Sequence, residues 1–144
     1  MSHVATIDLE IDDLTSLQAA AEALGLTFSE KKTYKWYGRS VGDYPLPNGF
    51  TEADLGKCDY AISLPGNSKA YEVGVVRNKN GKGYQLLWDF WNGGFGLEEK
   101  IGKNAGLLKQ SYAVSRAKKE MLRQGYRAST RKDAKGNVIL TFTE

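Results

Sequence analysis

The stretch from His3 to Ile11 alternates, with Ala5, Ile7, Leu9 and Ile11 on one side and Thr6, Asp8 and Glu10 on the other, which predicts a first strand with one buried face. After this strand, apolar residues recur every three or four positions, which is the spacing of a helix that buries one stripe. Asp12 or Asp13 can cap the start of this helix, and Gly25 suits its end. The chain therefore opens with a strand and a helix, and the stripe of that helix consists of Leu14, Leu17, Ala21 and Leu24.

The remaining strands are predicted by short apolar runs between turn-forming residues. The segment NKNGKG is a strong hairpin signal, because Asn and Gly accept the positive φ angles that tight turns require. A second hairpin surrounds DAKGN near the end of the chain. The expected strands cover residues 26–37, 59–64, 71–77, 84–91, 126–132 and 137–143, and the polar middle of the first of them, SEKKT, indicates a bulge or a turn.

A long irregular loop rich in Pro and Gly is expected from about residue 39 to residue 57, where the chain reads RSVGDYPLPNGFTEADLGK. One helical turn is predicted within it, at TEADL. Loops of this length are often functional or mobile, so its role stays open at this point.

The second helix begins at Leu97 or at Asn104, runs to about Gln124 and is closed by Gly125. Its apolar and basic positions fall on opposite faces, which predicts an amphipathic helix with a basic outer stripe. The strand after it adds two arginines, and such a surface can contact the phosphate backbone of a nucleic acid. A solvated face that balances the acidic first half is the alternative. The apolar face holds Leu107, Val114, Ala117 and Met121, and the basic surface holds Lys109, Arg116, Lys119, Arg123, Arg127 and Arg131.

The order of elements predicts an α+β fold in which two helices pack on an antiparallel sheet. Two passages, ALGLTF and RQGYRA, each lead from a helix through a glycine into a strand, which hints at a ferredoxin-like duplication. At 144 residues the chain fits one domain that includes the 39–57 loop. We therefore expect a single domain over residues 1–144.

Charge changes this picture more than overall composition does. The chain is 41% hydrophobic and 26% charged, as is ordinary for a globular protein, and its net charge is +3. Residues 1–60 carry five basic and ten acidic side chains, whereas residues 100–135 carry eleven basic and two acidic ones. The asymmetry fits an anionic partner, or attraction between the two halves of one fold.

The stretch LLWDFWNGGFGLEEKIG contains a candidate pocket. Alternation places Trp88 on one face of its strand and Asp89 and Trp91 on the other, where a buried carboxylate or a ligand contact can lie. The alternative is structural: Asp89 pairs with a basic residue or caps the next turn, and Trp91 covers an edge of the core. We keep both interpretations for Trp88, Asp89 and Trp91.

The glycine cluster from Asn92 to Gly96 lies between a strand and a helix, where main-chain N–H groups can bind a phosphate. It lacks the spacing of the known phosphate-binding motifs. Glu98 and Glu99 follow it, and they favour the helix dipole but repel an anion. We therefore interpret the cluster as a structural turn.

The sequence offers few candidate catalytic residues. His3 is the only histidine and lies near an end of the chain, where it is hard to hold rigid for a catalytic triad. Cys58 is the only cysteine, so the chain can form neither an intramolecular disulfide nor a cysteine zinc site as a monomer. We interpret Cys58 as a small buried residue, and we expect no metal and no cofactor.

The sequence gives no reason to expect membrane contact. No apolar run approaches the ~20 residues of a membrane helix. The start MSHVATIDLE has neither the basic nor the apolar region of a secretory signal. We therefore expect the chain to stay where it is made, in the cytoplasm.

The run AYEVGVVRNKNGKGYQLLWDFWNGGFGLEEKIGKNAGLLKQSYAVSRAKKEMLRQGYR, together with the start MSH and the strand and helix after it, resembles the hypothetical chloroplast reading frame family numbered thirty-five. Relatives of that family in cyanobacteria, other bacteria and phages carry a domain of unknown function. The likeness is densest from Tyr71 to Arg127, and the 39–57 loop has no place in it. The resemblance implies a small intracellular accessory protein, of the cytoplasm or the plastid stroma, and it assigns no site.

We expect a non-enzymatic binding or adaptor module with a basic helix face, whose partner is a protein or an anionic ligand. The alternative is a nucleic-acid or nucleotide-binding protein that uses the basic surface. A third hypothesis is an enzyme with a site between Trp88, Asp89, Trp91 and the 39–57 loop.

Overall fold

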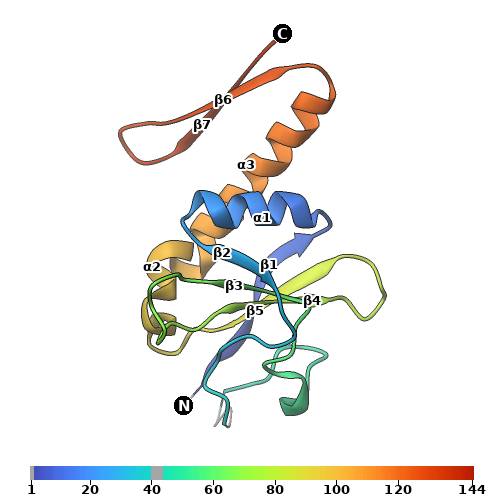
Figure 1. Ribbon diagram of the computed structural model, residues 1–144, viewed down its shortest axis with the longest axis vertical. Coiled ribbons are helices and arrows are strands. Elements are labelled where there is room, and N and C mark those ends of the chain that lie inside the picture. The colour runs from blue at the N-terminus through green and yellow to red at the C-terminus, as the bar shows by residue number, and fades with distance from the viewer. Residues whose placement is uncertain (1, 40–43) are drawn as a thin grey trace.

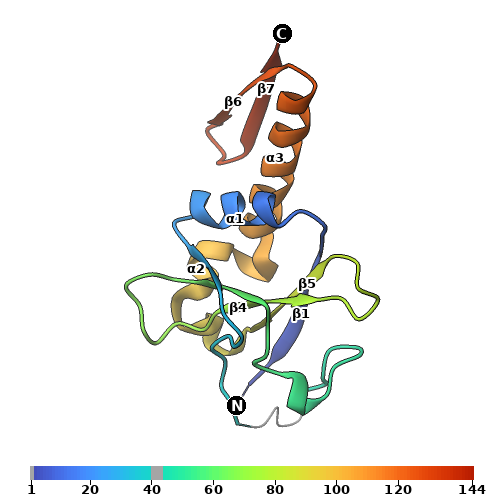
Figure 2. The same ribbon diagram turned by 45° about the vertical axis from the view of Figure 1, so that its right-hand side comes forward.

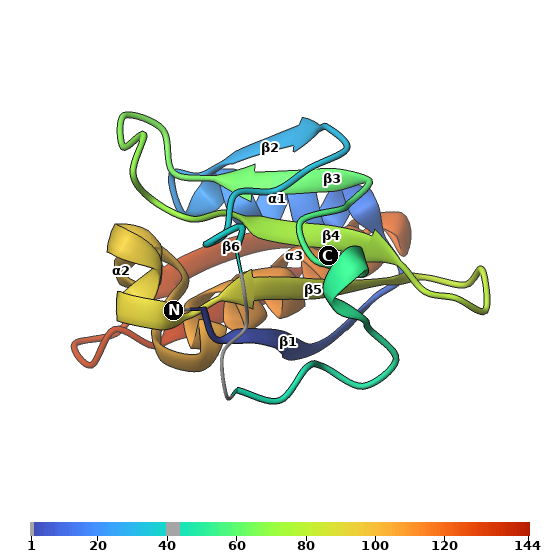
Figure 3. The same ribbon diagram turned by 90° about the horizontal axis from the view of Figure 1, so that it is seen from below.

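A five-stranded antiparallel sheet is the centre of the fold. The computed structural model describes residues 2–39 and 44–144. The strands lie in the order β1, β5, β4, β3, β2, so β1 and β2 are the edges of the sheet, and seen from below the helices lie behind it (Figure 3). The strands are β1 (Val4–Ile11), β2 (Thr27–Glu30), β3 (Tyr60–Ser63), β4 (Val73–Arg77) and β5 (Tyr84–Asp89).

Helices cover one face of this sheet (Figure 1). They are α1 (Leu14–Ala23), α2 (Leu97–Ile101) and α3 (Gly106–Arg123), and only the first part of α3 packs on the sheet. The larger core lies between them and the sheet, and it joins Leu17, Leu86 and Leu108. The predicted α+β class, an antiparallel sheet with helices packed on it, is confirmed, and the arrangement is consistent with the ferredoxin-like type of α+β fold.

The two helix, glycine and strand passages do not lead into equivalent strands. The first leads into β2, an edge of the sheet, whereas the second leads into β6 (Arg127–Lys132). Strand β6 pairs with β7 (Val138–Thr143) in a separate two-stranded ribbon. The two similar passages therefore do not form a duplicated unit.

The segment between β2 and β3 covers the other face of the sheet. Strand β2 ends at Glu30, and not near residue 37 as predicted, because the chain then leaves the edge and crosses the sheet. Tyr34, Leu55 and Cys58 form a second, smaller core there, against Ala61 and Leu87 of the strands. The predicted helical turn is present at Glu52–Asp54. Much of the 39–57 loop thus covers the sheet, although residues 40–43 of it lie outside the described residues.

The structure separates the two predicted starts of the second helix: Leu97 begins the short helix α2, whereas Asn104 lies two positions before the start of α3. Asn104 and Ala105 between them have positive φ angles of 55° and 58°, which a right-handed helix cannot continue through. The buried residues of α3 are Leu108 and Tyr112, whereas Leu107 of the predicted apolar face is 45% exposed. The periodicity identified an apolar stripe on the helix, but it did not identify which element the stripe lies against. Helix α3 has α1 on one side and the β6–β7 ribbon on another, and a helical pattern does not distinguish the two.

Residues 113–144 project from the rest of the molecule (Figures 1 and 2). We call them the C-terminal arm; they comprise most of α3 and the β6–β7 hairpin. No residue from Ala113 to Glu144 is buried. Two-stranded hairpins are marginally stable by themselves in water, so the β6–β7 hairpin depends on its contact with α3.

Tyr34 offers a test of the second core. It is 3% exposed, and burial raises the pKa of its phenol to about 12. Its hydroxyl has no hydrogen-bond partner within the described part of the chain. Because an unpaired buried hydroxyl is unfavourable, we expect Tyr34→Phe to raise the free energy of unfolding by about 1 kcal/mol, measured by urea denaturation. A loss of stability would show that the hydroxyl does have a partner.

Candidate functional site

Asp89 is a structural anchor in this fold. It is completely buried, and its carboxylate accepts hydrogen bonds from three main-chain N–H groups far apart in the sequence. These belong to His3 at 3.0 Å, Tyr37 at 3.1 Å and Trp91 at 3.0 Å. The structural alternative for Asp89, a cap on the next turn, is confirmed by the Trp91 bond. Every one of these bonds holds the backbone, so Asp89 fixes the start of β1 and the covering segment to the end of β5.

The three residues of the candidate pocket do not converge. Trp88 lies on the helix-covered face and borders a cavity of about 400 Å³ along β1, with Asp8, Glu98 and Lys109. Asp89 has no exposed surface. Trp91 is 36% exposed and packs edge-on against the His3 ring, with the ring centroids 5.0 Å apart.

The glycine cluster is a left-handed turn. Four consecutive residues from Asn92 to Phe95 have φ angles of 50°, 63°, 64° and 55°. Asn and Gly tolerate this region, which costs other residues about 1–2 kcal/mol each. The Gly94 carbonyl accepts a hydrogen bond of 2.9 Å from the Tyr71 N–H, which ties the turn to the segment before β4. The interpretation as a structural turn fits these contacts.

The basic surface of the prediction is divided in the structure. Arg116 pairs with Asp12 at 2.6 Å, and Lys119 pairs with Asp13 at 2.7 Å. Arg123 pairs with Glu120 of its own helix, at 2.7 Å. The hydrogen bond from Lys119 holds the pKa of Asp13 well below its usual range. Much of the stripe is therefore balanced by carboxylates, two of them from the acidic first half.

The pairing of Asp13 can be tested through pH. Asp13 also caps α1, accepting from the Ser16 N–H at 3.2 Å, and Asn caps nearly as well as Asp. Asp13→Asn therefore removes the ion pair and leaves the cap. Because the folded pKa lies below the ordinary 3.8, the stabilisation is present at neutral pH and is lost as the pH falls through the folded value. We expect Asp13→Asn to lose about 1 kcal/mol in urea denaturation at pH 7, and we expect this loss to become smaller as the pH is lowered to about 2, below the ordinary value of 3.8.

The control for that experiment is Asp8→Asn on the exposed side of β1. It removes one carboxylate from the same acidic half, and Asp8 has no ion pair among the described residues. An equal loss for both variants, or a loss for Asp13→Asn that is as large at about pH 2 as at pH 7, would contradict a specific pair between Asp13 and Lys119.

Two arginines of the predicted surface lie on the hairpin. Arg127 and Arg131 are both exposed. They lie four positions apart in β6, and because side chains alternate along a strand, they share one face of it. Their partners across the ribbon, Thr143 and Ile139, lie on the same face. Within the described part of the chain, neither arginine has a carboxylate at ion-pair distance. They differ in this respect from Arg116 and Arg123.

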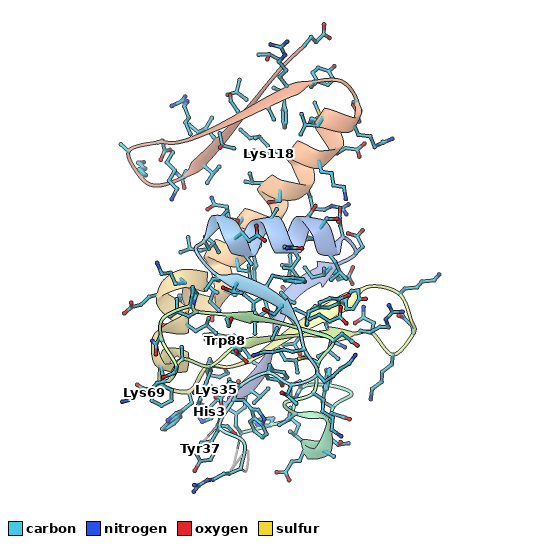
Figure 4. All side chains as sticks on the ribbon, in the orientation of Figure 1. His3, Lys35, Tyr37, Lys69, Trp88 and Lys118 are labelled. Atoms are coloured by element: carbon cyan, nitrogen blue, oxygen red, sulfur yellow. The ribbon has the colours of Figure 1, made fainter. Side chains whose placement is uncertain are left out.

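The opposite face of the hairpin borders a groove. The turn of the hairpin lies above the end of α1 (Figures 1 and 2). A cavity of about 230 Å³ lies between α1, α3 and the hairpin. Lys118 lies on the side of α3 that faces the hairpin (Figure 4). The groove is lined chiefly by Leu24, Leu107, Val114 and Val138, with Lys118 and Lys132 among its polar residues.

Sequence reasoning missed this groove. It grouped Leu107 with Val114 correctly, but it treated their stripe as the core-facing side of the helix. Leu107 is exposed, and Lys118 has no ion pair within the described residues, but their place in a groove follows only from the position of the hairpin next to α1. A local pattern does not report the direction in which a terminal hairpin turns.

Other chemistry is limited. Cys58 is buried, as interpreted, and burial raises the pKa of its thiol to about 11. Within residues 2–39 and 44–144, no three His, Cys, Asp or Glu side chains are grouped closely enough to hold a metal ion. No helix among the described residues has the length and apolar content needed to cross a bilayer.

Comparisons with protein-family models, with curated proteins and with solved structures gave no match to this chain. The candidate site therefore rests on the geometry of the chain itself. The resemblance to the chloroplast reading frame family stays a prediction.

Proposed function

We propose that this chain is a non-enzymatic binding module whose C-terminal arm contacts an anionic surface of a partner protein. The observation that carries the proposal is that an arm of 113–144 extends from a well-packed body without one buried residue. Leu122 of the arm is 59% exposed, and exposed apolar surface is a common feature of interaction sites. The resemblance, which implies a small accessory protein of the cytoplasm or the plastid stroma, is in keeping with it.

Charge supports an anionic partner. The arginines of the helix are paired within the fold, whereas Arg127 and Arg131 on the hairpin are exposed and lack such pairs in the described part of the chain. Arginine is enriched in the energetically important positions of interfaces, because it offers five donors and an extended planar surface. The hairpin can therefore contribute both charge and contact area to a partner.

Affinity capture from an extract of the source cells tests the proposal. Arg127→Gln/Arg131→Gln removes two cations from the arm, and Lys69→Gln/Lys103→Gln removes two exposed cations from the body. We expect the wild-type chain and the body variant to retain the same partner at about 150 mM salt, and the arm variant to lose most of it. Equal capture by all three proteins would contradict a role for the arm.

The second candidate function is nucleic-acid binding, and the shape of the arm favours it. A two-stranded ribbon fits the major groove of duplex DNA, and Arg127 and Arg131 lie on its outer face. Fluorescence anisotropy with short DNA and RNA duplexes tests this function. No binding at about 50 mM salt, where phosphate contacts are strongest, would rule it out.

A further inference from the structure

We propose that the groove under the hairpin binds bulky apolar side chains of an acidic segment in the partner protein. The proposal rests on the proposed function, because it names the partner chemistry that the arm selects. The groove joins the two parts of the molecule: Leu24 and Leu107 come from the body, and Val138 comes from the hairpin.

The apolar lining determines one half of the partner's chemistry. Leu107 is 45% exposed, and it is one of the few large apolar side chains left open in the described residues. An apolar cavity of about 150 Å³ can hold a benzene ring. The groove, at about 230 Å³, therefore has room for one large apolar side chain or two smaller ones. A phosphate backbone has no comparable group to place there, so the groove favours a protein segment over a nucleic acid.

The two lysines determine the other half. Lys118 and Lys132 lie in the groove, and no acidic residue occurs among its described lining residues. Neither lysine has an ion pair within residues 2–39 and 44–144. Carboxylates beside the apolar side chains of a partner can pair with them, and a basic segment would be repelled. Charge complementarity thus selects an acidic, amphipathic segment.

Three short peptides test this chemistry. The first carries leucines at helical spacing and glutamates elsewhere, the second has serine in place of each leucine, and the third has lysine in place of each glutamate. Binding to the full chain, labelled at Leu and Val methyl groups, is followed by NMR. We expect the leucine-glutamate peptide to bind at least about tenfold more tightly than either of the others. The largest shifts are expected at Leu24, Leu107, Val114 and Val138.

Matched variants on one helix locate the site. Leu107→Ser removes an exposed groove residue, and Leu122→Ser removes a leucine of α3 that is 59% exposed and does not line the groove. Leu107→Ser should weaken the leucine-glutamate peptide about tenfold, and Leu122→Ser less than about twofold. Lys118→Gln should weaken it about threefold, by a factor that shrinks as salt is added.

The outcomes separate this proposal from the one on which it rests. In one outcome, the serine peptide binds as well as the leucine peptide, and Arg127→Gln/Arg131→Gln abolishes the binding of both peptides. The arm then binds anions without the groove, so the groove proposal fails and the proposed function stands. Shifts confined to other surfaces, or equal effects of Leu107→Ser and Leu122→Ser, also overturn the groove. Self-association of the chain that the leucine peptide cannot displace would assign the groove to a second copy instead, and would overturn it as well.

Discussion

We expect Asp89→Ala to lower the free energy of unfolding by about 4 kcal/mol, the largest effect of any single substitution considered for this chain. The variant leaves the N–H groups of His3, Tyr37 and Trp91 without their acceptor. An unsatisfied buried donor costs about 1–3 kcal/mol. Three such losses add up to a large part of the 5–15 kcal/mol that stabilises a typical domain. Urea denaturation followed by circular dichroism measures the effect.

Two further variants sharpen that measurement. Asp89→Asn keeps one oxygen acceptor but turns an NH₂ group toward main-chain donors, so we expect it to recover little of the loss. Asp8→Ala, on the exposed side of β1, should stay within about 0.5 kcal/mol of the wild-type chain. An Asp89→Ala protein that unfolds at the wild-type urea concentration would show that the three bonds are not structural.

The second large effect is expected at Gly74. A Cβ at this position in β4 would lie 2.3 Å from Cδ1 and 2.5 Å from Cε1 of the Tyr34 ring. The ring is 3% exposed and cannot move aside without opening the second core. We therefore expect Gly74→Ala to lower the free energy of unfolding by about 2–3 kcal/mol, measured by urea denaturation.

Gly106 provides the matched control for Gly74. It starts α3 with an ordinary helical φ of −60°, and a Cβ there meets nothing within 4 Å. Gly106→Ala should raise the stability by about 0.5 kcal/mol, because alanine favours the helix. In the double variant Gly74→Ala/Tyr34→Leu, the smaller side chain should restore part of the loss. Equal effects of Gly74→Ala and Gly106→Ala would contradict the contact between Gly74 and Tyr34.

Much of the fold follows from local pattern. The alternation up to Ile11, the cap at Asp13 and the turn in NKNGKG each act within a few residues, and the structure has the expected element at each place. The end of β2 and the course of residues 31–39 and 44–58 were not predictable in this way. Tyr34 and Leu55 are buried only because this segment crosses a face that the helices leave uncovered, which is a property of the whole sheet.

The candidate site follows the same division. The sequence identified Arg127 and Arg131 as part of a basic surface, but it could not separate them from Arg116 and Lys119. That separation depends on Asp12 and Asp13, which lie about a hundred positions earlier in the chain. For Asp89, the cap on the next turn is local and was among the interpretations, whereas the bonds from the N–H groups of His3 and Tyr37, 86 and 52 positions away, could not be predicted from a local pattern.

Site-specific photo-crosslinking tests the central claim, that the C-terminal arm is the binding element, most directly. A photoreactive residue is placed at Thr141 of β7 or at Thr27 of β2, which are both exposed strand threonines, one in the arm and one in the body. In an extract of the source cells, we expect Thr141 to give a discrete crosslinked product that Arg127→Gln/Arg131→Gln removes, and Thr27 to give none. The same product from Thr27, or no product from Thr141, would contradict it.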